Sequence, residues 1–269
     1  MEKDSTSTQR KLSLCLLFAM VLAVGPVAVA ALSLSRADAL RIANKIWQNE
    51  CNGTVAGLTS WNAGEDFASL GIGHFIWYPE SKRGPFAESF PKLVTFLQAR
   101  GVAVPLWLRG SCPWSTRSEF ERAQNSAPMN ELRQLLADTA DVQAEFLLDR
   151  LELALPSMLE ETAPANRANV EKQFERVASS PPGCYALVDY VNFKGEGVLH
   201  TERYRGEGWG LLQVLEQMQS TSGANSAVTE FSRAAAAVLI RRVKNSPPER
   251  HESRWLPGWL KRVHTYATS

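Results

Sequence analysis

Apolar residues recur at intervals of three and four along most of the chain after residue 35, and this spacing predicts helices. The first expected helix runs from Ser35 to about Glu50, because Ser35 followed by Asp38 is typical of a helix start. Its expected apolar stripe is formed by Leu40, Ala43, Ile46 and Trp47. Glu50 continues this stripe, which is unusual for a carboxylate. Either Glu50 faces a pocket, or the helix frays there and leaves its side chain solvated, or it pairs with an arginine.

The same spacing predicts helices through most of the remainder of the chain. Residues 89–101 have a serine cap, a proline in the first turn and a glycine stop. The other expected helical segments are 130–159 with a break near Thr139, 167–178, 184–195, 208–218, 226–244 and about 258–266. The basic segments 240–244 and 255–266 are expected to dock on the core, with a membrane surface as the alternative.

Residues 53–78 follow a different pattern, rich in Gly, Thr, Ser and aromatic residues. The Asn62-Ala63-Gly64 turn signal separates two short apolar runs, which predicts a small β-hairpin or three-stranded sheet. The expected fold class is therefore α+β, predominantly helical, with a small sheet near the N-terminus.

The N-terminal 31 residues resemble a secretory signal. Arg10 and Lys11 precede a long uncharged apolar stretch, which ends in small residues around Ala30. We expect residues 1–31 to be a signal peptide, residues 32–269 to form a single domain, and the protein to be periplasmic or secreted. An uncleaved membrane anchor is the alternative, because the uncharged stretch is just long enough to cross a bilayer.

Composition narrows the remaining classes. With 45% hydrophobic and 21% charged residues the chain is ordinary globular protein, and a formal charge of +1 predicts no nucleic-acid partner. After export Cys51, Cys112 and Cys184 remain, which permits one disulfide of unspecified pairing. No spacing of Cys and His suggests a metal site, and no cofactor is expected.

Candidate chemistry gathers at the front of the chain. Glu50 ends a helix, Glu65 and Asp66 follow a turn, and Ser69 begins the glycine-containing run SLGIGH. If the sheet folds over the helix end, these groups line one cleft. Two opposed carboxylates suit glycosidic-bond hydrolysis, one as general acid and one ionised. Partial burial of Glu50 against its apolar neighbours would keep it protonated.

This layout resembles the phage-type lysozymes of the lysozyme-like superfamily. Glu50 matches the glutamate that closes the first helix in that family, residues 71–74 (GIGH) match its G-x-G-H sequence, and Ser69 falls at its threonine position. The helix around residues 186–197 is also similar, although the order around Asn192 is altered. The resemblance implies a lysozyme-like fold and muramidase-like cleavage of peptidoglycan or a related wall glycan. No aspartate falls at the family's second-carboxylate position, so Glu65 and Asp66 replace it by neighbourhood only.

Further residues are candidates for glycan binding. Trp61 and Tyr78 can stack on sugars or belong to the core, and His74 can bind substrate or tie the hairpin to a carboxylate. Gly71 and Gly73 allow close approach of a sugar or mark a bulge. Arg205 and Trp209 lie in an expected loop before a helix, where they grip an anionic group or merely cap and pack.

Three other functions remain open. A single-glutamate lytic transglycosylase needs no second carboxylate, and a non-catalytic glycan-binding or envelope scaffold protein needs neither. A cysteine nucleophile would pair Cys51 or Cys184 with His74 or His200, but neither cysteine has a recognisable peptidase surrounding.

Overall fold

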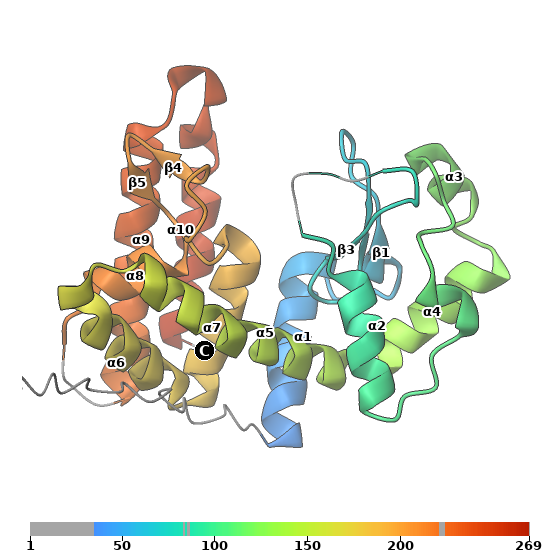
Figure 1. Cartoon of the computed structure of the whole chain (residues 1–269), viewed down its shortest axis with the longest axis horizontal. Helices are drawn as coiled ribbons and strands as arrows, with labels where there is room; N and C mark the ends of the chain where they lie inside the picture. Colours follow the sequence, from blue (N-terminus) through green and yellow to red (C-terminus); the bar gives the residue numbers. More distant parts are fainter. Residues whose placement is uncertain (1–34, 83, 85–86, 221–223, 269) are drawn as a thin grey trace, which may run out of the picture. The chain divides into compact units, whose positions relative to one another are not determined.

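Helices make up most of the structure, and two small antiparallel sheets complete it (Figure 1). The computed structural model describes residues 35–82, 84, 87–220 and 224–268. The expected signal peptide therefore lies outside the described residues. Within them, no helix combines the length and apolar character needed to span a membrane. The α+β, predominantly helical class is confirmed.

The first helix, α1 (Arg36–Cys51), begins where the sequence predicts. Ser35 caps it, because its Oγ accepts a hydrogen bond of 3.1 Å from the backbone N–H of Asp38. The predicted stripe is wrong at Leu40, which is 40% exposed. The buried face of the helix is instead formed by Ala39, Ile42, Ala43, Ile46 and Cys51.

The expected three-stranded sheet is present within residues 53–78. It has the order β1 (Thr59–Ser60), β2 (Ala68–Leu70), β3 (Phe75–Trp77), with both pairs antiparallel. A short 3-10 turn at Ala56–Leu58 leads into it. The predicted turn also forms, with Gly64 at φ 85°.

The helices that surround the sheet agree closely with the predicted segments. α2 (Phe90–Ala99) packs on β3, and the long predicted helix is broken at Thr139 into α4 and α5, as expected. The short helix α3 was not predicted. The bounds are α3 (Arg117–Arg122), α4 (Ala127–Asp138), α5 (Ala140–Glu161), α6 (Arg167–Ala178) and α7 (Pro181–Lys194).

The C-terminal third adds three helices and a hairpin. The helices are α8 (Leu211–Gln217), α9 (Ala224–Asn245) and α10 (Leu256–His264). The predicted loop at residues 202–210 is wrong for its middle part, because β4 (Arg203–Tyr204) pairs with β5 (Glu207–Gly208). Arg205 at φ 54° and Gly206 at φ 83° supply the two positive φ angles of a tight hairpin loop.

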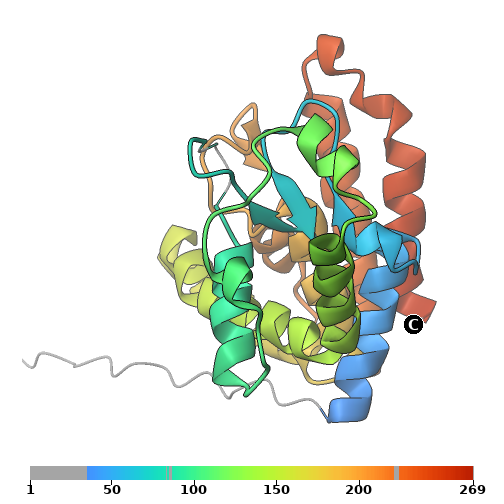
Figure 2. The same cartoon turned by 90° about the vertical axis from the view of Figure 1, so that its right-hand side faces the viewer.

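Helices α5 and α7 connect the sheet region and α1 with the C-terminal helices. α5 packs against α1, α2, α6 and α7, and α7 packs against α1 and α8 (Figure 1). Figure 2 shows the sheet region from the side, with α1 and α2 flanking it. The end of α1, the sheet and one face of both α5 and α7 consequently meet at one place.

Candidate functional site

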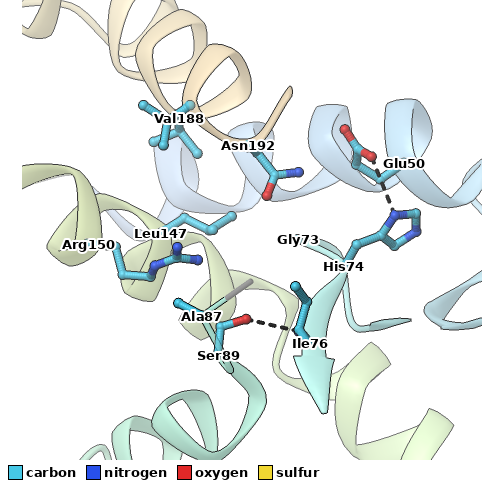
Figure 3. Close-up of a pocket in the computed structure, with 11 residues that line it drawn as sticks. Glu50, Gly73, His74, Ile76, Ala87, Ser89, Leu147, Arg150, Val188 and Asn192 are labelled. Atoms are coloured by element: carbon cyan, nitrogen blue, oxygen red, sulfur yellow. Dashed lines mark hydrogen bonds and ion pairs between the residues drawn. The ribbon is translucent and has the colours of Figure 1, made fainter. Parts of the chain in front are cut away.

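A cavity of about 300 Å³ lies where these elements meet (Figure 3). The end of α1, the β2–β3 turn, β3, the segment before α2, α5 and α7 all contribute to its wall. Its lining residues are Glu50, Gly73, His74, Ile76, Ala87, Ser89, Leu147, Arg150, Val188, Val191 and Asn192. Three of the predicted site residues, Glu50, Gly73 and His74, are therefore brought together.

The β2–β3 turn is held against the cavity by α5. The Gln143 side chain accepts a hydrogen bond of 3.0 Å from the backbone N–H of Ile72. Gly71 has φ 70°, and a Cβ there would lie 2.3 Å from Oε1 of Gln143. Gly71 thus permits the approach of Gln143, and it does not line the cavity; Gly73 does.

Glu50 is partnered on both carboxylate oxygens. Arg262, from α10, donates a hydrogen bond to its Oε1, and Nδ1 of His74 lies 3.5 Å from its Oε2. The Glu50 side chain is 15% exposed, so it is neither frayed nor fully solvated. Two of the structural alternatives to a catalytic role are thereby confirmed: Glu50 pairs with an arginine, and His74 ties the hairpin to a carboxylate.

Arg262 is itself held in place by hydrogen bonds to Asp189. Its Nε and Nη2 each donate a hydrogen bond of 2.8 Å to Asp189 of α7, which is fully buried. The Tyr266 hydroxyl donates a third bond to Asp189, of 2.6 Å, and Asn49 a fourth, of 3.1 Å. Burial alone would lower the pKa of Arg262, but Asp189 and Glu50 outweigh it and raise that pKa. The guanidinium is therefore a fixed charge beside Glu50.

The β2–β3 turn also places His74 beside Cys51. Sγ of Cys51 lies 3.8 Å from Nε2 of His74. Burial, and secondly the charge of Glu50, raise the pKa of the Cys51 thiol to about 12. The thiolate that a nucleophile requires is thus disfavoured at neutral pH. Cys51, Cys112 and Cys184 are all free and buried.

The expected second carboxylates lie elsewhere. Glu65 accepts a hydrogen bond of 3.1 Å from Asn62 within the β1–β2 turn, and Asp66 forms an exposed ion pair with Lys82. Neither lines the cavity, and Glu50 is the one carboxylate among its described lining residues. Ser69 is 3% exposed in the central strand and does not line the cavity either. The expectation that these residues share a cleft with Glu50 is corrected accordingly.

The predicted aromatic and arginine contacts are also outside the cavity. Trp61 packs on Phe120 with ring centroids 5.8 Å apart, and Tyr78 packs on Phe67 at 5.3 Å. Trp209 is 7% exposed and lies 4.6 Å from the Tyr204 ring. These three aromatic residues belong to the core. Arg205 is exposed at the tip of the β4–β5 hairpin.

Three polar residues that line the cavity were not predicted as site residues from the sequence. Arg150 lies three residues after Leu147 on α5, and Asn192 lies four after Val188 on α7, so each shares a face with an apolar lining residue. Ser89 accepts a hydrogen bond of 2.9 Å from the backbone N–H of Ile76. Helical spacing could have flagged Arg150, because it falls on the inward stripe of α5.

Chemically, the cavity offers one carboxylate, one arginine and a few neutral polar groups. Within the described part of the chain, no three His, Cys, Asp or Glu side chains gather as a metal-binding group. No protein-family model, no curated protein and no solved structure matches this chain.

Proposed function

We propose that this protein is an exported glycosidase of lysozyme-like fold that cleaves peptidoglycan or a related wall glycan, with Glu50 as general acid. One observation carries the proposal: Glu50 closes α1 at the wall of a cavity of about 300 Å³, beside the turn that bears the GIGH sequence. A protonated carboxylic acid at such a position can donate to the oxygen that leaves a glycosidic bond.

His74 and Arg262 act as positioning residues in this proposal. Arg262 fixes the Glu50 carboxylate from one side, and His74 faces it from the other. For Glu50 to serve as an acid, it must enter the reaction protonated, so the entering substrate has to displace water and weaken these contacts.

The lack of a second carboxylate among the described lining residues favours transglycosylation over hydrolysis. In the transglycosylase route Glu50 protonates the leaving oxygen as the C1–O bond breaks. A hydroxyl of the same sugar then attacks C1 and returns its proton to Glu50, which forms an anhydro-sugar end. Hydrolysis instead needs a second carboxylate as base or nucleophile, and the described lining residues do not supply one.

A non-catalytic glycan-binding protein is the second candidate. It is favoured by the Arg262 contact, because a carboxylate committed to a guanidinium is less free to donate a proton. In that case the cavity binds a wall glycan and releases nothing.

Digestion of purified peptidoglycan by residues 32–269 separates these candidates. Mass spectrometry of the fragments gives anhydro-sugar ends for transglycosylation and reducing ends for hydrolysis. We expect fragments from the unaltered protein and none from Glu50→Gln. Full activity of Glu50→Gln would remove the acid assignment, and retention on sacculi without any fragment would identify a binding protein.

A further inference from the structure

Arg150 lies opposite Glu50 in the cavity, and its environment differs from that of three other half-buried arginines, Arg176, Arg242 and Arg262. It is carried by α5, and its guanidinium points into the space between α5, α7 and β3 (Figure 3). Among the described residues, no side chain or carbonyl lies within hydrogen-bond or ion-pair distance of it. Its nearest aromatic neighbour is Phe146, whose ring centroid is 6.0 Å away.

Three other half-buried arginines have carboxylate partners. Arg176 lies 3.2 Å from Glu230, Arg242 lies 2.8 Å from Glu252, and Arg262 contacts Asp189. Burial lowers the pKa of Arg150, and the charge of Glu196 acts against this. A guanidinium nevertheless keeps its charge in proteins, so the cost of holding it there is not offset by a hydrogen-bonded or ion-paired partner within the described chain.

An anion entering the cavity would supply that missing partner. The planar guanidinium suits a carboxylate, to which it can donate two parallel hydrogen bonds. At about 300 Å³ the cavity lies at the small end of ligand sites, which fits a sugar unit rather than a folded partner. Ser89 and Asn192 add neutral polar groups, while Leu147 and Val188 add apolar wall.

We propose that Arg150 forms an anion subsite that binds a carboxylate of the glycan held in the cavity. This inference deepens the proposed function, since it makes a carboxylate-bearing glycan the preferred ligand of the Glu50 site. The carboxylate can be borne by the sugar ring, as in a lactyl ether or a uronic acid, or by an attached peptide. The position of Arg150 inside a cavity of one-sugar scale favours the carboxylate on the ring.

Binding by calorimetry tests the subsite independently of cleavage. The probes are matched tetrasaccharides: one neutral and N-acetylated, one with free lactyl carboxylates, and one whose lactyl groups are amidated by a short peptide. We expect the free-carboxylate probe to bind at least about tenfold more tightly than the neutral one, as a charge-assisted pair allows. Arg150→Gln should abolish the difference in affinity between the free-carboxylate and the neutral probe, and Arg150→Lys should restore part of it.

Arg205→Gln is the matched control, because Arg205 is an exposed arginine outside the cavity. It should leave all three affinities unchanged. Equal binding of neutral and free-carboxylate probes by the unaltered protein, or an unchanged preference in Arg150→Gln, would overturn the proposal. A preference for the peptide-amidated probe that depends on Arg150 would move the carboxylate to the peptide and overturn its placement on the ring.

The outcome for the subsite is separable from that for catalysis. Arg150-dependent binding without fragments from any wall glycan would retain the subsite and remove the glycosidase. Cleavage that depends on Glu50 but shows no Arg150-dependent preference between the probes would retain the glycosidase and remove the subsite.

Discussion

The two turns of the three-stranded sheet each contain a glycine at positive φ but have different surroundings. The β1–β2 turn contains Asn62, Gly64 and Glu65, and its side chains face solvent or one another. The β2–β3 turn contains Gly71 and His74; α5 packs on it, and it reaches the Glu50 carboxylate. Both turns use a glycine at positive φ, 85° at Gly64 and 70° at Gly71. The difference comes from what packs against each turn.

This comparison shows why a carboxylate near a turn in sequence need not belong to a site. Glu65 and Asp66 precede β2 and do not line the cavity, while Glu50 on a separate helix does. One partner of Glu50, Arg262, comes from the far end of the chain, whereas the partners of Glu65 and Asp66 come from nearby segments.

Removing the Glu50 carboxyl group, which lies beside the β2–β3 turn, gives the largest expected effect. Glu50→Gln should lower the rate of peptidoglycan cleavage by at least about a hundredfold, because general acid catalysis is lost. Glu65→Gln combined with Asp66→Asn should change the rate by less than about twofold, since neither lines the cavity. Initial rates of fragment release measure both. A large loss in the double variant would break the distinction between the turns.

The buried ion pair between Arg262 and Asp189 should contribute more to stability than the exposed ion pair of Asp66. Asp189→Asn leaves Arg262 without its buried counter-charge, and we expect a loss of about 3–5 kcal/mol in the free energy of unfolding. Asp66→Asn removes an exposed ion pair with Lys82 and should cost less than about 1 kcal/mol. Urea unfolding compares the two variants, and equal losses would contradict the contrast.

Lys194, at the end of α7, makes the stability of the protein sensitive to pH. Burial, with the nearby charge of Arg242 next, lowers its pKa to about 6, although the faces of Trp259 and Phe193 favour the ammonium. Between this value and the 10.5 of the unfolded chain, the unfolded state binds the extra proton. Stability therefore rises with pH across that range and is lowest below pH 6.

Lys194→Met removes this penalty. We expect the variant to be more stable than the unaltered protein by a few kcal/mol at pH 6 and by progressively less as the pH approaches 10.5. Thermal unfolding at a series of pH values measures the difference. A constant difference across the series would show that Lys194 titrates normally.

The glycines of the two turns sharpen the comparison at the smallest scale. Gly71→Ala combines positive-φ strain with a clash against Gln143, and should cost about 2–3 kcal/mol. Gly64→Ala has the same strain but no atom within 4 Å of the new Cβ, so about 1 kcal/mol is expected. Chemical unfolding of both variants gives the part of the loss that is due to the crowded surroundings of Gly71, in which Oε1 of Gln143 is the nearest atom. Equal losses would show that the clash relaxes at no cost.

Local signals were sufficient for most of the fold. The Ser35 cap, the break at Thr139 and the turn at Gly64 each depend on neighbours a few residues away, and each is found as predicted. The β4–β5 hairpin was missed because its strands have two residues each. Leu40 was misplaced because the spacing is compatible with two adjacent stripes, and only packing against α5 and α7 selects one.

The site was less predictable, because its decisive contacts are distant in sequence. Glu50 and His74 were identified from the helix end and the GIGH run. Arg262, Asp189 and Arg150 have no local pattern that links them to Glu50, and their roles emerge only when α5, α7 and α10 are assembled.

The Arg262–Glu50 contact joins residues 212 positions apart, and this separation has a consequence for biosynthesis. During translation the sheet and α1 leave the ribosome long before α10, so the nascent chain exposes a glutamate with no guanidinium beside it. A chain halted before residue 262 contains every described lining residue of the cavity but lacks the guanidinium that compensates Asp189. Completion of the last helix thus marks the moment at which the site acquires its final charge arrangement.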